Sequence, residues 1–260
     1  MAKNDKEVAV KNEHGLPAEL ADEMALDAGA GQEDITAADV SIPFLRILQQ
    51  MSPQCIRSKG EYIEGAQAGQ IFNTVTGELW PEDDGPIIIP CSYNFKYILW
   101  ADRSSKTAEG IQATFVRGQD LPPTTKDDRG RDITEEGHVL TPTSEFFVLI
   151  FNPETNAFEQ AVMSLSSTQL TPGKKWAALI KQQVQQTAEG PKPAALFSRM
   201  YKAKTLARSN DDGDWSVWDI NLHGVVEDID LYRAAKSFSS AVNSGKASAK
   251  YAEPEGDEVM

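Results

Sequence analysis

The chain has 260 residues, of which 40% are hydrophobic, and a formal net charge of -14 at pH 7. This length suffices for one sizeable core domain with tails, and no stretch approaches the roughly 20 apolar residues that cross a bilayer, so no membrane span is expected. Residues 1–12 mix lysines with acids and lack an apolar core, so no secretory signal is expected and the predicted location is the cytoplasm. Two widely separated cysteines and three isolated histidines argue against a disulfide framework or a zinc site, and no cofactor is expected.

The acidity is concentrated at the two ends of the chain. Residues 1–40 carry three lysines and ten acidic residues, and we expect them to be largely disordered, with a transient helix around Ala18–Leu26. Residues 243–260 are rich in Gly, Ser and Ala and then acidic, and we expect a flexible tail. The folded domain is therefore predicted to span residues 41–242. The four acids near the C-terminus are Glu253, Glu255, Asp257 and Glu258.

Between these ends the sequence reads mainly as strands joined by turns. An apolar entry segment at Ile42–Met51 comes first, and residues 118–137 form a long polar loop. β-Branched runs, alternation with a period of two and flanking turn residues predict strands at Gln70–Val75, Ile87–Ile89, Cys91–Trp100, Ser144–Phe151, Ala157–Met163, Phe197–Ala207 and Trp215–Val226.

Two helices are predicted in the second half. Thr171 and Pro172 suit the N-cap and the first helical position of a helix that runs to about Gln186, with Trp176 leading its apolar stripe. A second amphipathic helix is predicted at Asp228–Val242. The first helix therefore separates the third and fourth main strands, as in five-stranded Greek-key barrels of the oligonucleotide-binding type. The predicted fold is mainly β, an OB-fold-like barrel with one core helix and a C-terminal helix.

Positive charge gathers in one window, residues 174–208, which contains a single acid, Glu189. Aromatic residues are interleaved with its cations, which is the composition that a polyanion with exposed bases requires. A solvated helix face followed by an ordinary strand is the alternative interpretation. We predict that the cations gather on one surface; they are Lys174, Lys175, Lys181, Lys192, Arg199, Lys202, Lys204 and Arg208.

The order and chemistry of these segments resemble those of bacteriophage single-stranded DNA-binding proteins with a barrel and an acidic C-terminal tail. The segments that carry the resemblance are Ile42–Leu45, Gly69–Trp80, Tyr93–Trp100, the Trp176 helix, and Phe197–Arg208 with Asp212–Trp218. The resemblance implies a non-enzymatic protein that coats single-stranded DNA in phage replication or recombination. It also implies that the tail acids Glu253, Glu255, Asp257 and Glu258 dock on partners such as a polymerase or a helicase-primase. Tails of that family commonly end in an aromatic residue, whereas this chain ends in Val259-Met260.

Within this hypothesis we expect Arg199 and Tyr201 to face the DNA, with Lys202 and Lys204 reaching round an exposed edge. Lys96, Trp100 and Arg103 are further candidates at the rim of the barrel. A last group of candidates is Lys174, Lys175, Lys181 and Arg208. The rings of Tyr93, Phe95 and Tyr97 share one strand face, as a stacking platform or, more often for such rings, as core. The sequence leaves the oligomeric state open, a homodimer included.

Two other classes of function stay open. No phosphate-binding loop, nucleophile elbow or His-Glu-x-x-His motif occurs. A metal-dependent nuclease would use the carboxylates of Asp211, Asp212, Asp214 and Asp219, although Asp and Gly are also the usual residues of a hairpin turn. An interaction or virion protein would use the β core as a scaffold and the acidic ends as docking arms.

Overall fold

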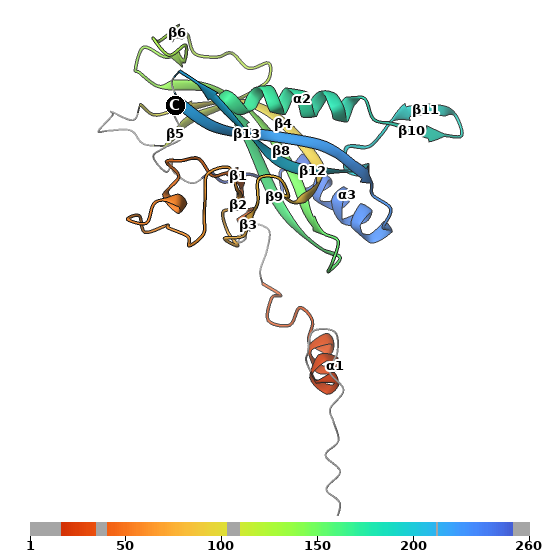
Figure 1. Ribbon diagram of the computed structural model, residues 1–260. Coiled ribbons are helices and arrows are strands. Elements are labelled where there is room, and N and C mark those ends of the chain that lie inside the picture. The colour runs from red at the N-terminus through yellow and green to blue at the C-terminus, as the bar shows by residue number, and fades with distance from the viewer. Residues whose placement is uncertain (1–16, 35–40, 103–109, 212, 252–260) are drawn as a thin grey trace, which may run out of the picture. The chain divides into compact units, whose positions relative to one another are not determined.

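The computed structural model describes residues 17–34, 41–102, 110–211 and 213–251 (Figure 1). Contacts divide the chain into two units, residues 1–40 and 41–260. The first unit contains α1 (Ala18–Leu26), which confirms the predicted helix; none of its residues is buried. The rest of the predicted acidic N-terminal segment, residues 1–16 and 35–40, lies outside the described residues.

The second unit is built mainly from strands. Its helices are α2 (Leu170–Lys181) and α3 (Ile229–Asn243), with short 3-10 turns at Pro53–Cys55, Ser167–Gln169 and Leu196–Ser198. Its strands are β1 (Leu45–Ile47), β2 (Ile71–Asn73), β3 (Leu79–Trp80), β4 (Ile87–Trp100), β5 (Ile111–Val116), β6 (Thr125–Lys126), β7 (Asp132–Ile133), β8 (Val139–Asn152), β9 (Ala157–Ser166), β10 (Val184–Thr187), β11 (Gly190–Pro193), β12 (Arg199–Asn210) and β13 (Gly213–Val225).

One curled antiparallel sheet contains most of these strands. The long strands β4 and β8 pair along their whole length at its centre. β12 joins the first residues of β4 and continues into the β12–β13 hairpin, whereas β5 pairs with the last residues of β4. β9 pairs with β8 on its other side, and β7 and β6 follow at the start of β8. The predicted fold class, mainly β with a barrel-like sheet, is confirmed.

Apolar side chains cover both faces of this sheet, because residues alternate between its faces. On one face Phe146, Tyr201 and Ala203 pack around Trp176 of α2. On the other face Phe147 and Leu149 pack against α3, with Phe238 at the centre. Figure 1 shows α2 and α3 on opposite sides of the sheet. We call these the α2 face and the α3 face.

Glutamine side chains satisfy the inner edge of β13, where a closed barrel would pair β13 with β9. The amide of Gln49 accepts from Ser216 N (2.9 Å) and donates to Ser216 O (3.1 Å). The amide of Gln169 likewise donates to Ser216 O (2.9 Å) and accepts from Trp218 N (3.1 Å). In the described residues β9 and β13 do not pair, so two side chains replace part of a strand ladder at this opening.

Three local predictions need correction. α2 begins at Leu170 and ends at Lys181, so Thr171 lies inside the helix and is not its N-cap. The predicted helix runs to about Gln186, but Val184 instead starts the β10–β11 hairpin, because the chain leaves the helix at Gln182. Residues 244–251, which we expected to be flexible, pack on the α3 face through Ala247 and Tyr251. Residues 252–260, with the four tail acids, lie outside the described residues.

Candidate nucleic-acid interface

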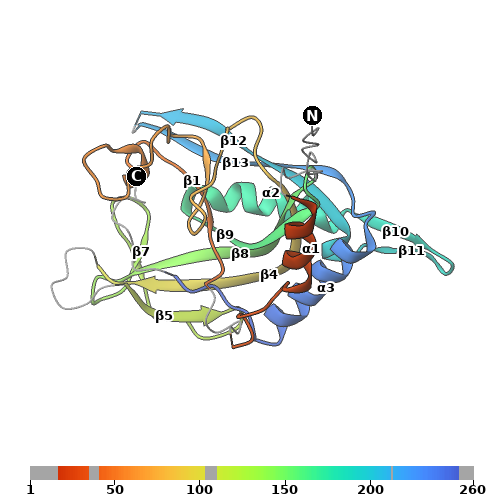
Figure 2. The ribbon, with the colours of Figure 1, turned by 90° about the horizontal axis from the view of Figure 1, so that it is seen from below.

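Four aromatic side chains form a row on the α2 face, beyond the part that α2 covers. Tyr93, Phe95 and Tyr97 alternate along β4, and Phe115 of β5 lies directly opposite Tyr97. Tyr93 shares this face with Phe146, its partner on β8, which stacks on Trp176. We call the four rings of Tyr93, Phe95, Tyr97 and Phe115 the aromatic row. Figure 2 shows the strands that carry it, β5 and β4, next to β8.

The rings of the row are exposed or half-buried, and neither core cluster includes them. Tyr93 is 38% exposed; its ring packs on Phe146 at 4.8 Å, and its hydroxyl hydrogen-bonds Ser144 Oγ at 3.3 Å. Phe95 and Tyr97 meet edge to face at 5.3 Å. The rings are therefore held in place from below while part of each stays available to a ligand.

A cation lies directly on the row. The guanidinium of Arg117, just after β5, sits 4.7 Å from the centre of the Phe95 ring. In the described part of the chain Arg117 has no ion pair with a carboxylate. A planar cation on an aromatic ring offers both a stacking surface and a partner for phosphate. Rings and charge thus combine at one place.

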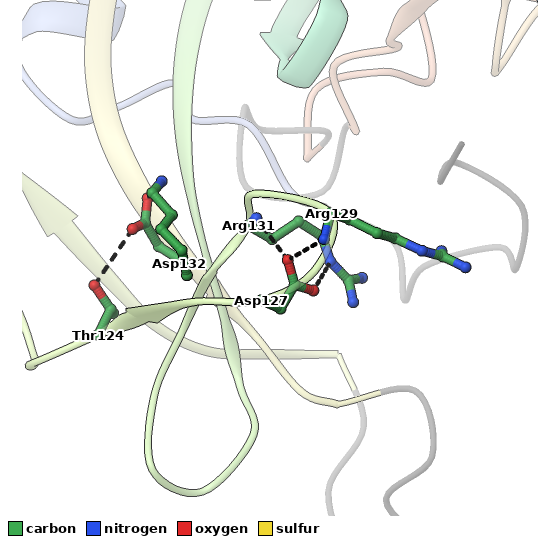
Figure 3. A network of polar contacts seen from close by, with 6 residues as sticks. Thr124, Asp127, Arg129, Arg131 and Asp132 are labelled. Atoms are coloured by element: carbon green, nitrogen blue, oxygen red, sulfur yellow. Dashed lines mark hydrogen bonds and ion pairs between the residues drawn. The ribbon is translucent and has the colours of Figure 1, made fainter. Parts of the chain in front are cut away.

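The β6–β7 hairpin, which pairs with the start of β8, adds further cations. Figure 3 shows its polar contacts. Its turn is held by the Asp127 carboxylate, which accepts from Arg129 N, from Arg131 N and from Arg131 Nε. Partial desolvation works against ionisation of this carboxyl, but the bonds from Arg131 and Arg129 outweigh it and keep the pKa of Asp127 below its usual value. Lys126 pairs with Asp132 at 2.8 Å. The Arg129 side chain points away from this network, so its charge faces solvent.

The opposite side of β4 holds two predicted DNA-binding residues, and both are covered. The Lys96 ammonium forms an ion pair of 2.6 Å with Glu145, a buried carboxylate. The Tyr251 ring lies over that ammonium at 4.8 Å and meets Trp100 edge to face at 6.1 Å. Lys96 and Trp100 are therefore brought together, but as the lining of an internal contact. Arg103 lies outside the described residues.

The Tyr251 side chain is held on the sheet by its hydroxyl group and by its ring. Its hydroxyl bonds to Glu145 and, at 3.1 Å, to Ser164 Oγ, and its ring packs on Phe44 at 5.2 Å. Burial, with the adjacent Glu145 carboxylate, raises the pKa of Tyr251 well above its ordinary value. The C-terminal segment that we expected to be free thus ends, at its last described residue, in an anchored ring.

On β12 the prediction that Tyr201 faces the DNA is wrong. Tyr201 is fully buried against Trp176, at 5.8 Å between ring centres, because it points to the α2 face under the helix. Burial raises the pKa of Tyr201 to about 12. Arg199 donates to Val184 O (2.9 Å) and to Ser198, at the base of the β10–β11 hairpin.

The other predicted cations do not form one surface. Lys202 and Lys204 alternate with Tyr201 and so point to the face opposite α2, with Arg208 further along the strand. Lys202 pairs with Asp84 at 2.7 Å, and this hydrogen bond lowers the pKa of Asp84. On α2, Lys175 pairs with Asp219 at 3.2 Å, while Lys174 and Lys181 are exposed. The predicted single basic surface is therefore divided between two faces, because strand alternation separates its members.

The aspartates that a metal-dependent nuclease would use lie at or near the β12–β13 turn. Asp219 is engaged with Lys175 and Asn221. In the ranges that the structure describes, no group of three or more His, Cys, Asp or Glu side chains is placed to hold a metal ion. Asp212 lies outside those ranges, between Asp211 and Asp214, which are both exposed.

Sequence reasoning missed Phe115, Arg117 and Arg129. Ile111–Val116 does alternate apolar and polar residues, with Phe115 in phase with Ile111 and Ala113, and this signal of a strand was available. The nearness of Arg117 to Phe95 depends on how β5 pairs with β4, which no local pattern specifies.

Comparisons with known proteins give one match. No curated protein and no solved structure matches the chain. Of the helices in the described residues, none is both long enough and apolar enough to cross a membrane. The model of one family, described as Pam3 phage gp34-like protein, matches residues 10–248, and the chain therefore belongs to this bacteriophage protein family.

Proposed function

We propose that this phage-family protein binds single-stranded DNA through the aromatic row, as a non-enzymatic coat during phage DNA replication or recombination. The observation that carries the proposal is the row itself: Tyr93, Phe95, Tyr97 and Phe115 on one sheet face, with the Arg117 guanidinium on Phe95. Rings that serve only the core would be enclosed, whereas Tyr93 keeps 38% of its surface exposed.

The chemistry of a single strand suits this surface. Unpaired bases stack on aromatic rings, and each stacked base contributes roughly 1–3 kcal/mol to binding. This stacking depends little on sequence because every base has a π-face. The charges of Arg117 and Arg129 neutralise phosphates and release counterions. In a duplex the bases are already stacked on one another, so we expect weaker binding. The protein's net charge of -14 does not oppose local binding, because much of it lies in residues 1–40 and 251–260.

The test is fluorescence anisotropy with a labelled oligo(dT) of about 30 nucleotides, roughly two site sizes for one such barrel. We compare the wild type with Tyr93→Ala and Tyr97→Ala, alone and together. Each single change should weaken binding about 5- to 150-fold, the equivalent of one lost stacking contact of roughly 1–3 kcal/mol. The matched control is Phe158→Ala, which removes a ring that is 45% exposed on β9.

Three results would contradict the proposal. Equal affinity of the wild type and the double variant, with the fold intact by circular dichroism, would show that the row is not the binding site. Absence of any binding at low salt would favour the interaction or virion protein. Mg²⁺-dependent degradation of the oligonucleotide that Asp211→Asn and Asp214→Asn abolish would favour the nuclease.

A further inference from the structure

Among the strands of the described ranges, the β10–β11 hairpin pairs with none outside itself, and it projects from the end of α2 (Figure 1). All four residues of β10 are exposed, as is most of β11. An isolated two-stranded hairpin is at best marginally stable in water, because most of its backbone and side chains stay solvated. Pairing with another strand would therefore stabilise this hairpin. Its two edges differ in whether their backbone groups can form hydrogen bonds with such a strand.

The edge of β11 is closed to further pairing. Ala194 N donates to Gln183 O at 2.9 Å, so in the alternating antiparallel ladder Gln183, Gln185 and Thr187 turn their backbone groups toward β11. The residues opposite the intervening positions are Pro191 and Pro193. Their ring nitrogens face the outer edge of β11, and proline has no N–H to donate there.

The edge of β10 is open. By the same alternation, Val184 and Gln186 turn their backbone N–H and C=O groups away from β11. Val184 O accepts from the Arg199 guanidinium, which shows the direction of this edge. In the described residues no other hydrogen bond uses the outward groups of Val184 and Gln186. Val184 and Gln186 line a hollow of about 290 Å³ together with Val225 and Tyr232.

We propose that this edge of β10 is a homodimer interface, in which the β10 strands of two copies pair antiparallel about a two-fold axis through Gln185. The pairs are then Val184 with Gln186 of the second copy, Gln185 with itself, and Gln186 with Val184. The outward groups of the two strands meet in hydrogen-bonded positions, with Val184 O using its second lone pair because the first accepts from Arg199. The two hairpins then form one four-stranded sheet. Pro191 and Pro193 end this sheet on both sides, so pairing closes at two copies.

Charge and apolar surface favour a second copy as the occupant. The hairpin carries one acid and one base, Glu189 and Lys192, which pair with each other. The hairpin itself is thus a neutral element on a protein of net charge -14, and the cation that lines this edge, Arg199, already donates to Val184 O. Val184 and Val225, which line the hollow at this edge, each keep about half of their surface exposed, and dimerisation would bury part of it.

The first test is the mass of the full-length protein by light scattering after size exclusion, over a wide range of concentration. We expect the wild type to approach twice the 28.5 kDa of one chain as concentration rises. Gln186→Pro should hold the protein monomeric, because it removes the outward N–H but no bond to β11. Gln186→Ala keeps the N–H and should dimerise like the wild type. A wild type that stays monomeric, or a Gln186→Pro variant that dimerises equally, would overturn the interface.

The second test fixes the register. Residues that face each other in a non-hydrogen-bonded antiparallel pair have Cα atoms about 4.5 Å apart, within the range that a disulfide spans. Gln185→Cys should therefore crosslink two copies under mild oxidation, whereas Lys192→Cys on β11 should not. Equal crosslinking of both variants, or crosslinking of Lys192→Cys alone, would exclude this pairing. Neither test depends on DNA, so the interface can fail while the proposed function holds, and the reverse.

Discussion

The two sides of β4 both carry aromatic rings near a cation, but they differ in how far these groups are exposed to solvent. Toward the α2 face, Tyr93, Phe95 and Tyr97 stay partly exposed under a single cation. Toward the α3 face, Lys96 and Trp100 lie against Tyr251, and the charge of Lys96 is neutralised by Glu145. On the α2 side the rings and the Arg117 cation are partly exposed to solvent. On the α3 side similar groups form internal contacts that attach the C-terminal segment to the sheet.

The difference comes from segments far away in sequence. Tyr251, which covers Lys96, lies more than 150 positions further along the chain, and Phe44, which packs on Tyr251, lies before the sheet begins. Strand alternation specifies which residues share a face, but the cover of each face is set by tertiary packing. A cation and a ring on the same strand face therefore do not by themselves predict a binding site. They can equally be covered by another segment, as Tyr251 covers Lys96 and Trp100.

The largest effect should come from Lys96→Ala. It leaves the buried carboxylate of Glu145 without its cation, and breaking a buried pair in this way costs about 3–5 kcal/mol. Urea unfolding measures the loss. The control is Lys126→Ala, which breaks an exposed pair with Asp132 and should cost less than about 1 kcal/mol. If Lys96→Ala instead weakened oligo(dT) binding and left stability unchanged, the α3 face would be the DNA site.

Tyr251→Ala should have the next largest effect. The ring contacts Phe44 and Trp100, and its hydroxyl bonds to Glu145 and Ser164. Truncating a partly exposed ring should cost about 2–3 kcal/mol, somewhat below the range for fully buried rings.

Hydrogen exchange locates this effect. The amides of residues 244–251 should lose protection in Tyr251→Ala, while those of β4 and β8 should change little. Tyr251→Phe keeps the ring and loses the hydroxyl bonds, so it should fall between the variant and the wild type. Uniform loss of protection across the sheet would mean that Tyr251 supports the whole core and not one segment.

The sequence predicted the elements of the sheet better than it predicted the site. The alternation of Cys91–Trp100 and the strands predicted at Ser144–Phe151 and Ala157–Met163 located most of β4, β8 and β9, because these patterns are local. Ile87–Ile89, predicted as a separate strand, is the first part of β4. The position of α2 between the third and fourth main strands was predicted for the same reason. The end of α2 was missed, since the apolar stripe continues to Val184 although the backbone has already left the helix.

The site could be predicted only in part. The shared face of Tyr93, Phe95 and Tyr97 follows from their spacing, but their exposure depends on where α2 ends over the sheet. Tyr201 has the same alternation as those rings, and α2 covers it. The basic window misled because α2 covers one face of the sheet, whereas Lys202 and Lys204 of β12 point to the other face, which composition does not reveal.

A smaller effect, on binding alone, should come from Arg117→Ala. A cation on a ring is worth about 0.5–2 kcal/mol, so affinity for oligo(dT) should fall by roughly 2- to 30-fold. If Arg117 also contacts a phosphate, the slope of log affinity against log salt should flatten by about 0.7. The control is Arg233→Ala, an exposed cation on α3, on the other face of the sheet. A drop in stability without a change in affinity would assign Arg117 to the fold.

The smallest effect should come from Tyr201→Phe, which tests the covered part of the α2 face. The Tyr201 hydroxyl is buried and has no hydrogen-bond partner among the described residues, so its removal should be neutral or stabilising by up to about 1 kcal/mol near neutral pH. Burial raises its pKa from about 10 to about 12, so the folded protein holds this proton more tightly than the unfolded chain does. That contribution to stability is present below about pH 10 and is lost as the pH rises through about 12.

Tyr201→Phe lacks this loss, and its stability advantage over the wild type should therefore grow between neutral pH and about pH 11. Urea unfolding of both proteins at the two pH values measures the difference, and Tyr251, which is present in both, contributes equally to each. An advantage that stayed constant with pH would mean that the Tyr201 hydroxyl reaches water in the folded state. The ring would then lie next to the aromatic row and not beneath α2. The exposed part of the α2 face would in that case include Tyr201.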